Sequence, residues 1–497
     1  MGDLTQLKGT VYIPDPSTPL YKLLSRWSDT GVIACPAVIV VPESEDDIKI
    51  ALAYARENKL QVFPAGGGHG SFVPITSRTL YLDLKKFDQV QVNRKAQTVT
   101  VGGGAVTAQL IKTCTAQGFF TTWANSNTVG VVGSMLGGGI VGLCLLVSVY
   151  TFRTVYLVYQ SNSINPANNN WITRTHDRSC PPHPSHHRWG DIAEVGPFST
   201  GEHLALFHAL CGAGNGLGVI TALTMKIFPL ADLDLSPDGV WVRRLIFPAP
   251  AIDVAADTFN KLHPLPPAMA LTLLNARAPP TAPQPGAPMI ILTVTYYGSS
   301  KHGEQAASLL FEAELVSQTI TAQTMFTPMV SINDSLEPLN AHGGFKDVHS
   351  AWIRSTKGET IQAAFTKWLD FTTTHEDATH TTLVLSSCNP QKRMEIAETA
   401  EGQARFFDHR DRGIQAIIVS WVTNESTQSA ATNFADEIKA LYRQNELPSD
   451  PPRTILNNLG PSTKLEELHT ADKIEQLRKL ARVWDPSGIF WQPWDRE

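Results

Sequence analysis

The chain has 497 residues, which is too long for one ordinary hydrophobic core and predicts two or three domains. Its 42% hydrophobic and 17% charged residues are typical of a globular protein, and the net charge of −6 disfavours nucleic acid or an anionic membrane as the main partner. Six cysteines form no C-x-x-C pair, so disulfides are not demanded.

The N-terminal segment, residues 1–8, has neither a basic region nor an apolar stretch. We therefore expect no secretory signal and predict a cytoplasmic location. Gly2 suggests myristoylation, but Gln6 stands where that motif needs serine or threonine.

Strand and helix patterns alternate over the next hundred residues. Ser44 and the acids that follow it predict an N-capped helix over 48–58, because Ile48, Ala51, Leu52 and Ala55 fall on one stripe. The remaining predicted elements are strands at 36–42, 60–63 and 80–84, a hairpin-like pair at 89–93 and 97–102, and a helix at 105–117. This order predicts a mixed α/β nucleotide-binding domain.

A glycine-rich loop, Gly66-Gly67-Gly68-His69-Gly70, follows the predicted strand 60–63. Glycine leaves backbone N–H groups free to approach an anion, so the loop predicts a phosphate cradle, with a plain turn as the alternative. Three more glycine-rich bends, at 101–104, 133–139 and 212–218, suggest one long phosphate-bearing ligand. None of them matches a P-loop or the dinucleotide fingerprint of parallel sheets.

The order of these motifs resembles that of a known family. The segments that carry the resemblance are 35–42, 45–48, 66–70, 128–131, 206–221 and 484–490. Together they are similar to FAD-linked oxidases of the vanillyl-alcohol oxidase superfamily, which have a PCMH-type FAD-binding domain. The berberine-bridge-enzyme-like branch is most similar, and the P-A-G-G-G-H-G form of the loop resembles fungal enzymes of secondary metabolism.

The resemblance implies that the His69 ring is bonded to the 8α carbon of the flavin, while glycine amides hold the pyrophosphate. The alternative is a histidine that only hydrogen-bonds the cofactor. Ser126 stands where many relatives have a second attachment cysteine, so at most one covalent link is expected, and Val129 favours reaction with oxygen. The cofactor-binding residues predicted in this way are Gly66, Gly67, Gly68, His69, Gly70, Ser71, Thr128, Val129, Gly130, Gly133, Val219 and Asn457.

The chain also departs from the family pattern. Ala65 stands where relatives often have arginine. In place of the Y-x-N-Y motif the chain has Ile455-Leu456-Asn457-Asn458, so the asparagine carries over and both tyrosines are lost. The catalytic base is therefore unassigned, with His409 or a tyrosine of the second domain as candidates.

Residues 143–198 do not match the family. Arg153 interrupts the apolar run too early for a membrane span. A metal site from His176, His183, His186 and His187 is disfavoured by the flexible Pro/Ser/Asn context, so we expect no metal. The third alternative is that the stretch is foreign to the fold.

From residue 230 the pattern changes. Strands predicted at 240–247, 289–297, 381–387 and 415–422 alternate with helices at 250–262, 302–316, 358–371 and 426–446. They predict an antiparallel sheet with helices on one side, which in the family forms the substrate side of the pocket. Candidate lining aromatics are Trp241, Tyr296, Tyr297 and Trp421, and a packing helix is expected over 470–483.

The sequence therefore predicts an α+β, two-domain flavoprotein. Its parts are an FAD-binding domain at 1–229 with an anomalous insert at 143–198, a substrate domain at 230–448, and a C-terminal return to the first domain at 449–497. The predicted reaction is oxidation of a small organic substrate by hydride transfer to FAD, with molecular oxygen as acceptor and neither nucleic acid nor membrane as partner. The alternatives are a degenerate flavin-binding protein and a dehydrogenase with non-covalent flavin.

Overall fold

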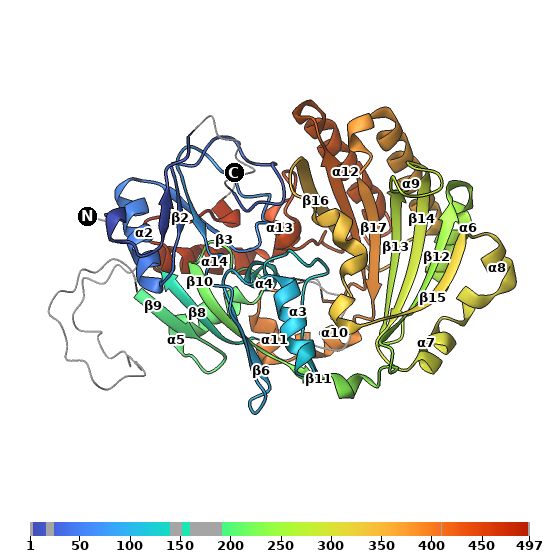
Figure 1. Cartoon of the computed structure of the whole chain (residues 1–497), viewed down its shortest axis with the longest axis horizontal. Coiled ribbons are helices and arrows are strands. Elements are labelled where there is room, and N and C mark those ends of the chain that lie inside the picture. The colour runs from blue at the N-terminus through green and yellow to red at the C-terminus, as the bar shows by residue number, and fades with distance from the viewer. Residues whose placement is uncertain (1–2, 16–23, 140–151, 160–190, 409, 496–497) are drawn as a thin grey trace.

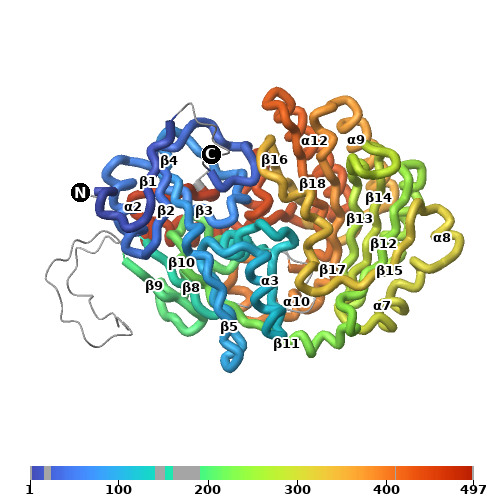
Figure 2. Tube along the Cα trace, in the orientation of Figure 1, coloured from blue at the N-terminus to red at the C-terminus, as the bar shows by residue number. Residues whose placement is uncertain are grey.

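The computed structural model describes residues 3–15, 24–139, 152–159, 191–408 and 410–495. Gly2, His409 and the histidines at 176, 183, 186 and 187 lie outside the described residues. Two sheets and the C-terminal residues form one half of the molecule, and a third, larger sheet forms the other half (Figure 1). The trace in Figure 2 shows the chain returning to the first half after α12. The expected two-part mixed architecture is confirmed.

The four-stranded sheet carries the glycine-rich loop. Its strand order is β1-β2-β4-β3, with β1 antiparallel and the others parallel. Helix α2 begins as expected, because Ser44 Oγ accepts a hydrogen bond of 3.2 Å from the Asp47 amide and the Asp47 carboxylate accepts one from the Ser44 amide. The elements are β1 (Thr10–Tyr12), β2 (Val38–Val41), α2 (Glu45–Glu57), β3 (Gln61–Ala65) and β4 (Thr79–Asp83).

The five-stranded sheet is antiparallel throughout, in the order β5-β6-β10-β8-β9, and includes the expected hairpin. Strands β7 and β11 form a separate two-stranded antiparallel sheet. The elements are β5 (Val90–Asn93), β6 (Thr98–Gly102), α3 (Thr107–Ala116), β7 (Phe119–Phe120), α4 (Val131–Leu136), β8 (Phe152–Tyr159), β9 (Asp191–Val195), α5 (Gly201–Leu210), β10 (Val219–Lys226) and β11 (Phe228–Pro229).

Strands β8 and β9 come from the stretch 143–198 that does not match the family. β8 lies between β10 and β9, and its Val155 and Leu157 side chains are fully buried in the core. The hypothesis of a foreign segment is therefore wrong for these two strands. Residues 143–151 and 160–190 lie outside the described residues.

The seven-stranded sheet is antiparallel, in the order β15-β12-β14-β13-β17-β18-β16. Helices α6, α9 and α12 cover one face, where alternate residues such as Leu271 and Leu273 are buried. The elements are β12 (Val240–Pro248), α6 (Ile252–Lys261), β13 (Met269–Arg277), β14 (Pro288–Tyr296), β15 (Thr321–Thr327), β16 (Phe345–Ile353), α9 (Gly358–Thr374), β17 (Thr382–Cys388), β18 (Ile414–Val422) and α12 (Gln428–Arg443).

The helix expected over 302–316 is broken. The chain forms α7 (Ser300–Ala306), a short 3₁₀ helix and α8 (Ala313–Ser317), and the Leu310 carbonyl between them accepts a 2.9 Å hydrogen bond from the Arg243 guanidinium. Because the Leu310 carbonyl already accepts a hydrogen bond from a side chain, it does not need the backbone amide of the next helical turn as a donor, and the helix can break there. Short helices α10 (Gln391–Ala397) and α11 (Ala400–Ala404) follow β17.

The C-terminal return consists of α13 (Leu465–Leu468), α14 (Ala471–Trp484) and an extended segment. That segment lies beside β3: the Val62 amide donates to the Ile489 carbonyl at 2.7 Å, and Val62 is bridged to Phe490. The Asp485 carboxylate accepts hydrogen bonds from the Ile489 and Phe490 amides at 3.0 and 2.9 Å. No helix in the described ranges is both long and apolar enough to cross a membrane.

Candidate active site

A cavity of about 590 Å³ lies between the glycine-rich loops and the seven-stranded sheet. Residues 66–70, Gly130, Gly133 and the bend at 214–218 line one wall. The other wall is the sheet face that the helices leave uncovered, and it comes from β12, β13, β14, β16, β17 and β18. The cavity thus joins the two parts of the fold.

Most residues predicted to bind the cofactor line this cavity. They are Gly66, Gly67, Gly68, His69, Gly70, Val129, Gly130, Gly133 and Asn457. Ser71 and Val219 are buried beside it without lining it, and Thr128 contacts His69. The binding role of all twelve residues stays a prediction.

Two of the glycines are required by close contacts between backbone segments. A Cβ on Gly67 would lie 2.1 Å from the Gly130 nitrogen, and a Cβ on Gly68, whose φ is +74°, would lie 1.8 Å from the Ser25 carbonyl oxygen. Neither distance admits a side chain. These glycines pack loop against loop, which is a role that the sequence pattern did not separate from ligand binding.

The loop nevertheless keeps free hydrogen-bond donors. Among the described residues, the amides of 66–70 donate to no carbonyl or side chain. At Gly133, which lines the cavity, a Cβ would meet nothing within 4 Å. Consecutive unpaired amides beside an open space fit the phosphates of a dinucleotide such as FAD.

His69 is held by two neighbours. Its Nε2 is hydrogen-bonded to Thr128 Oγ1 at 2.8 Å, and its ring stacks on Trp27 with centroids 5.0 Å apart and planes 13° apart. Burial, with a smaller contribution from His342 and Lys346, lowers the pKa of the ring to about 3. The imidazole is therefore neutral at pH 7, and Nδ1 makes no hydrogen bond within the described part of the chain.

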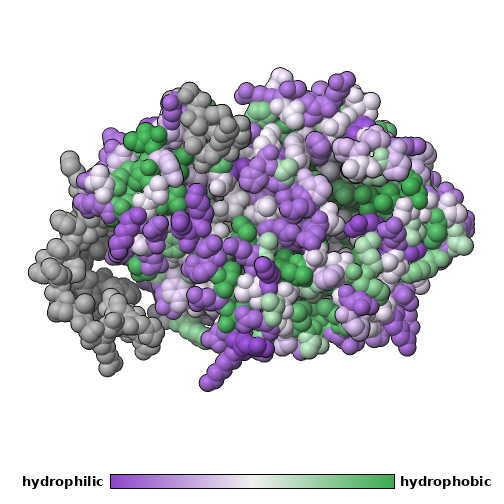
Figure 3. All heavy atoms as spheres, viewed as in Figure 1, coloured by the Kyte–Doolittle hydropathy of each residue, from purple (hydrophilic) through white to green (hydrophobic). Residues whose placement is uncertain are grey.

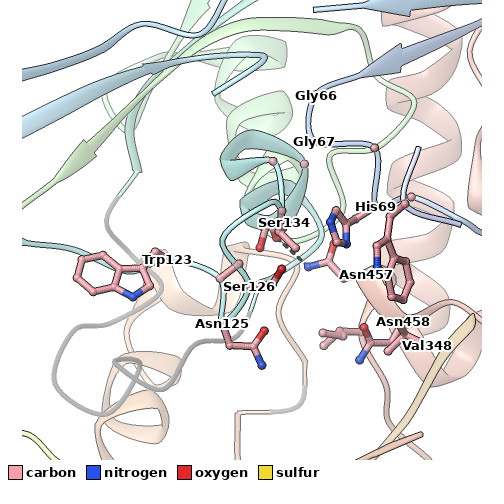
Figure 4. A pocket seen from close by; sticks show the side chains of 18 of the residues that line it. Gly66, Gly67, His69, Trp123, Asn125, Ser126, Ser134, Val348, Asn457 and Asn458 are labelled. Atoms are coloured by element: carbon pink, nitrogen blue, oxygen red, sulfur yellow. Dashed lines mark hydrogen bonds between the residues drawn. The ribbon is translucent and has the colours of Figure 1, made fainter. Parts of the chain in front are cut away.

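Asn457 lies next to the loop in a short 3₁₀ helix, Leu456–Asn458. Its side-chain amide donates a 2.8 Å hydrogen bond to the Ser134 carbonyl, which ties the C-terminal return to α4. Figure 4 shows Asn457, Ser134 and His69 together on one side of the cavity. Ser126 faces the same cavity and is hydrogen-bonded to Asn340.

Comparisons with known proteins agree with this geometry. Residues 36–155 match the family model described as an FAD binding domain. The FAD-linked oxidoreductase hasG of Aspergillus fumigatus is 23% identical over 98% of this chain and 97% of its own. Wild-type BBE-like 1 of Physcomitrella patens has a TM-score of 0.73 at 15% identity, over 99% of this chain and 97% of its own. A variant of berberine bridge enzyme has a TM-score of 0.71 at 15% identity, over 99% and 98%.

The chain is an FAD-linked oxidoreductase with the berberine-bridge-enzyme-like fold. The family resemblance seen in the sequence is thereby confirmed. Among the described residues of this flavoprotein, no group of three or more His, Cys, Asp or Glu side chains is placed so that it could hold a metal ion.

Sequence reasoning missed the polar side chains on the sheet wall of the flavoprotein. Arg244, Thr272, Thr293, Ser386 and Gln415 line the cavity. The alternation along each strand separates them from the core side chains, because Leu271 and Leu273 face the helices and Thr272 faces away, but it does not tell which face meets the cavity.

The aromatic predictions are only partly right. Tyr297 lines the cavity, but Trp241 is fully buried in the core under the helices, and Trp421 packs on Lys346 with its ring centroid 4.1 Å from Nζ. Tyr296 also packs against the helix-side core. Hence the described cavity lining contains one tyrosine, and no Asp, Glu or Lys.

Proposed function

We propose that the chain oxidises a small, natural-product-like organic molecule by hydride transfer to FAD, with molecular oxygen as electron acceptor. We also propose that FAD is attached by one covalent link, through His69. In this proposal residues 1–229 and 449–497 bind the cofactor, residues 230–448 form the substrate side, and the location is cytoplasmic.

The observation that carries the proposal is the unpaired amides of 66–70 beside His69, facing a sheet across the same cavity. Bound FAD supplies the redox chemistry, since it accepts a hydride and passes the electrons on. The chain itself binds and orients: the amides suit the phosphates, and Asn457 and His69 stand beside the cavity.

A single link through His69 is supported by the state of its ring. The ring is neutral at pH 7 and held in place by Thr128 and Trp27, so one nitrogen keeps its lone pair for bond formation. Ser126 lines the cavity but cannot form a thioether. Val129 also lines the cavity, and its support for oxygen as the electron acceptor comes only from the resemblance to the family.

The proton of the oxidised group needs an acceptor. Tyr297 is the only tyrosine of the described lining and is a buried residue, so it replaces the tyrosines absent at 455 and 458 as the candidate base. The size of the substrate is supported by analogy: berberine bridge enzyme has been solved with (S)-reticuline. His409, the other candidate, lies outside the described residues.

Spectroscopy of the purified chain tests the proposal. We expect a yellow protein whose colour stays in the pellet after acid precipitation, and a His69→Ala variant whose flavin, if bound, is released. Flavin released from the unmodified chain would support the non-covalent dehydrogenase instead. A colourless chain that takes up no added FAD would support the degenerate alternative.

The oxidase step is tested separately. With a turned-over alcohol or amine under air, we expect one hydrogen peroxide for each substrate oxidised. Turnover that needs an artificial electron acceptor, with no peroxide, would contradict oxygen as the acceptor. Loss of turnover in Tyr297→Phe, with flavin content unchanged, would identify Tyr297 as the base.

A further inference from the structure

One rung of the seven-stranded sheet is polar where it faces the cavity. The strand registers pair Arg244 with Thr293, Thr293 with Thr272, Thr272 with Ser386, and Ser386 with Gln415. All five residues line the cavity. We call this set the polar row. Since neighbouring strands lie about 4.8 Å apart, the row spans about 19 Å across five strands.

The neighbouring rung is apolar. Ile291 is paired with Leu274, Leu274 with Val384, and Val384 with Ile417, and these four residues also line the cavity. A molecule lying on this wall therefore meets an apolar surface along one line and hydrogen-bonding groups along the next. Such a wall suits a flat organic body with polar groups along one edge.

The polar row is without hydrogen-bond partners in the part of the chain that the structure describes. Among the described residues, none of its five side chains makes a hydrogen bond or an ion pair. The Nε atom of Arg244 is buried without an acceptor. Burial lowers the pKa of this guanidinium, and no carboxylate of the described residues offsets that effect. A half-buried cation without a counter-charge is costly, so it suggests a ligand that supplies one.

The preceding arginine shows the contrast. Arg243 points to the other face of the sheet, where it donates to the Leu310 carbonyl at 2.9 Å and to Thr324 Oγ1 at 3.2 Å. Its guanidinium also lies 4.2 Å from the centre of the Phe311 ring. The Nε atom of Arg243 is also buried without an acceptor, but both of its terminal nitrogens are hydrogen-bonded, whereas those of Arg244 make no hydrogen bond among the described residues.

We propose that the substrate is an elongated organic carboxylate whose carboxylate binds Arg244 and whose hydroxyl or carbonyl groups bind along the polar row. The planar guanidinium donates two parallel hydrogen bonds to a carboxylate, which a neutral group cannot match. This inference rests on the proposed function, because it takes the sheet wall to be the substrate side of the cavity.

The test compares two probes of the same shape, 2-naphthoate and 2-naphthamide, by calorimetric titration of the purified chain. We expect naphthoate to bind at least tenfold more tightly. Arg244→Gln should remove that preference and Arg244→Lys should keep part of it. Arg243→Gln, on the opposite face, should keep it in full. Circular dichroism verifies that each variant is folded.

Equal affinity of the unmodified chain for the two probes would overturn the inference without any variant. A preference that persists in folded Arg244→Gln would overturn it as well. Calorimetry measures binding of the two probes whether or not the chain contains flavin, and the flavin content is measured on the same sample. If the chain contains flavin but does not prefer 2-naphthoate, only the inference of a carboxylate substrate is refuted. If the chain is colourless, the proposed function is refuted.

Discussion

The two walls of the cavity are built in different ways. The loop wall consists mainly of backbone, where glycines pack so closely that a side chain at 67 or 68 has no room. The sheet wall consists of side chains on a regular antiparallel ladder. On the face of the molecule drawn in Figure 3, polar and apolar residues are intermingled. The comparison suggests that the loop wall is fixed by folding, whereas the sheet wall can vary without loss of the fold.

The largest effect is expected at the loop wall, from Gly67→Ala. Its Cβ would lie 2.1 Å from the Gly130 nitrogen and 2.5 Å from the Thr128 carbonyl oxygen, so two backbone segments would have to separate. We expect a loss of at least about 3 kcal/mol in unfolding free energy, and loss of flavin. Chemical denaturation measures the unfolding free energy, and flavin absorbance measures the flavin content.

The matched control is Gly70→Ala in the same loop. There the nearest atom to a new Cβ is a Phe63 ring carbon at 4.0 Å, and we expect a change below about 1 kcal/mol. Equal losses at 67 and 70 would show that contact between the loops is not what fixes this wall.

Low pH should lower the unfolding free energy of the chain through His349, which lies on the face of the sheet opposite the cavity. This residue follows the cavity-lining Val348 in β16 and is 1% exposed, and neither of its ring nitrogens has a hydrogen-bond partner among the described residues. Burial, then Lys439, lowers the pKa of the ring to about 4, with Asp436 opposing. The unfolded chain therefore takes up a proton near pH 6.5 that the folded chain refuses.

The stability contributed by neutral His349 is present above pH 6.5 and is lost as the pH falls towards 4. We expect the unfolding free energy to fall by up to about 1.4 kcal/mol per pH unit from this group alone. Denaturation curves from pH 7 to 4 should show a smaller slope for His349→Leu than for the unmodified chain. Identical slopes would refute the role of this histidine.

A smaller effect on stability, of the opposite sign, is expected from Gly133→Ala. This glycine lies inside α4, and a Cβ there would meet no atom of the described residues within 4 Å. Alanine should raise the stability of the flavin-free chain by about 0.5–1 kcal/mol, because it favours the helix. It should at the same time lower the FAD content, since the new methyl group points into free space at the cavity. Unchanged FAD content would place the cofactor elsewhere.

The smallest change in stability is expected on the sheet wall, from Thr293→Val. The two side chains are close in shape, and the Thr293 hydroxyl makes no hydrogen bond within the described part of the chain. We expect a change in unfolding free energy below about 0.5 kcal/mol, and an increase in KM for the substrate. A large loss of stability would contradict the view that the sheet wall tolerates variation.

The loop wall could largely be predicted from the sequence. The strand before the loop, the cap at Ser44 and the position of His69 beside a cavity follow from local patterns, and the structure has them. Local patterns suffice here because the glycines, the cap and the strand are neighbours in the chain.

The sheet wall could be predicted only in part. Strands β13, β15 and β16 were not expected. In β16, Lys346 and His349 break the apolar alternation. Lys346 can be buried because Trp27 and Trp421 enclose its ammonium group, which also donates hydrogen bonds to the Trp27 and Ala341 carbonyls. These contacts join residues far apart in the chain. Alternation also shows that two faces of a strand differ, but not which face meets the cavity, so Arg244 was not singled out.

The bond from Asn457 to Ser134 spans 323 positions of the chain, and Val62 of β3 is bridged to Phe490. During translation, the strand that leads into the glycine-rich loop must therefore wait without this neighbour until almost all of the protein has left the ribosome. A nascent chain halted near residue 449 should be unable to retain flavin, however well its earlier sheets have formed.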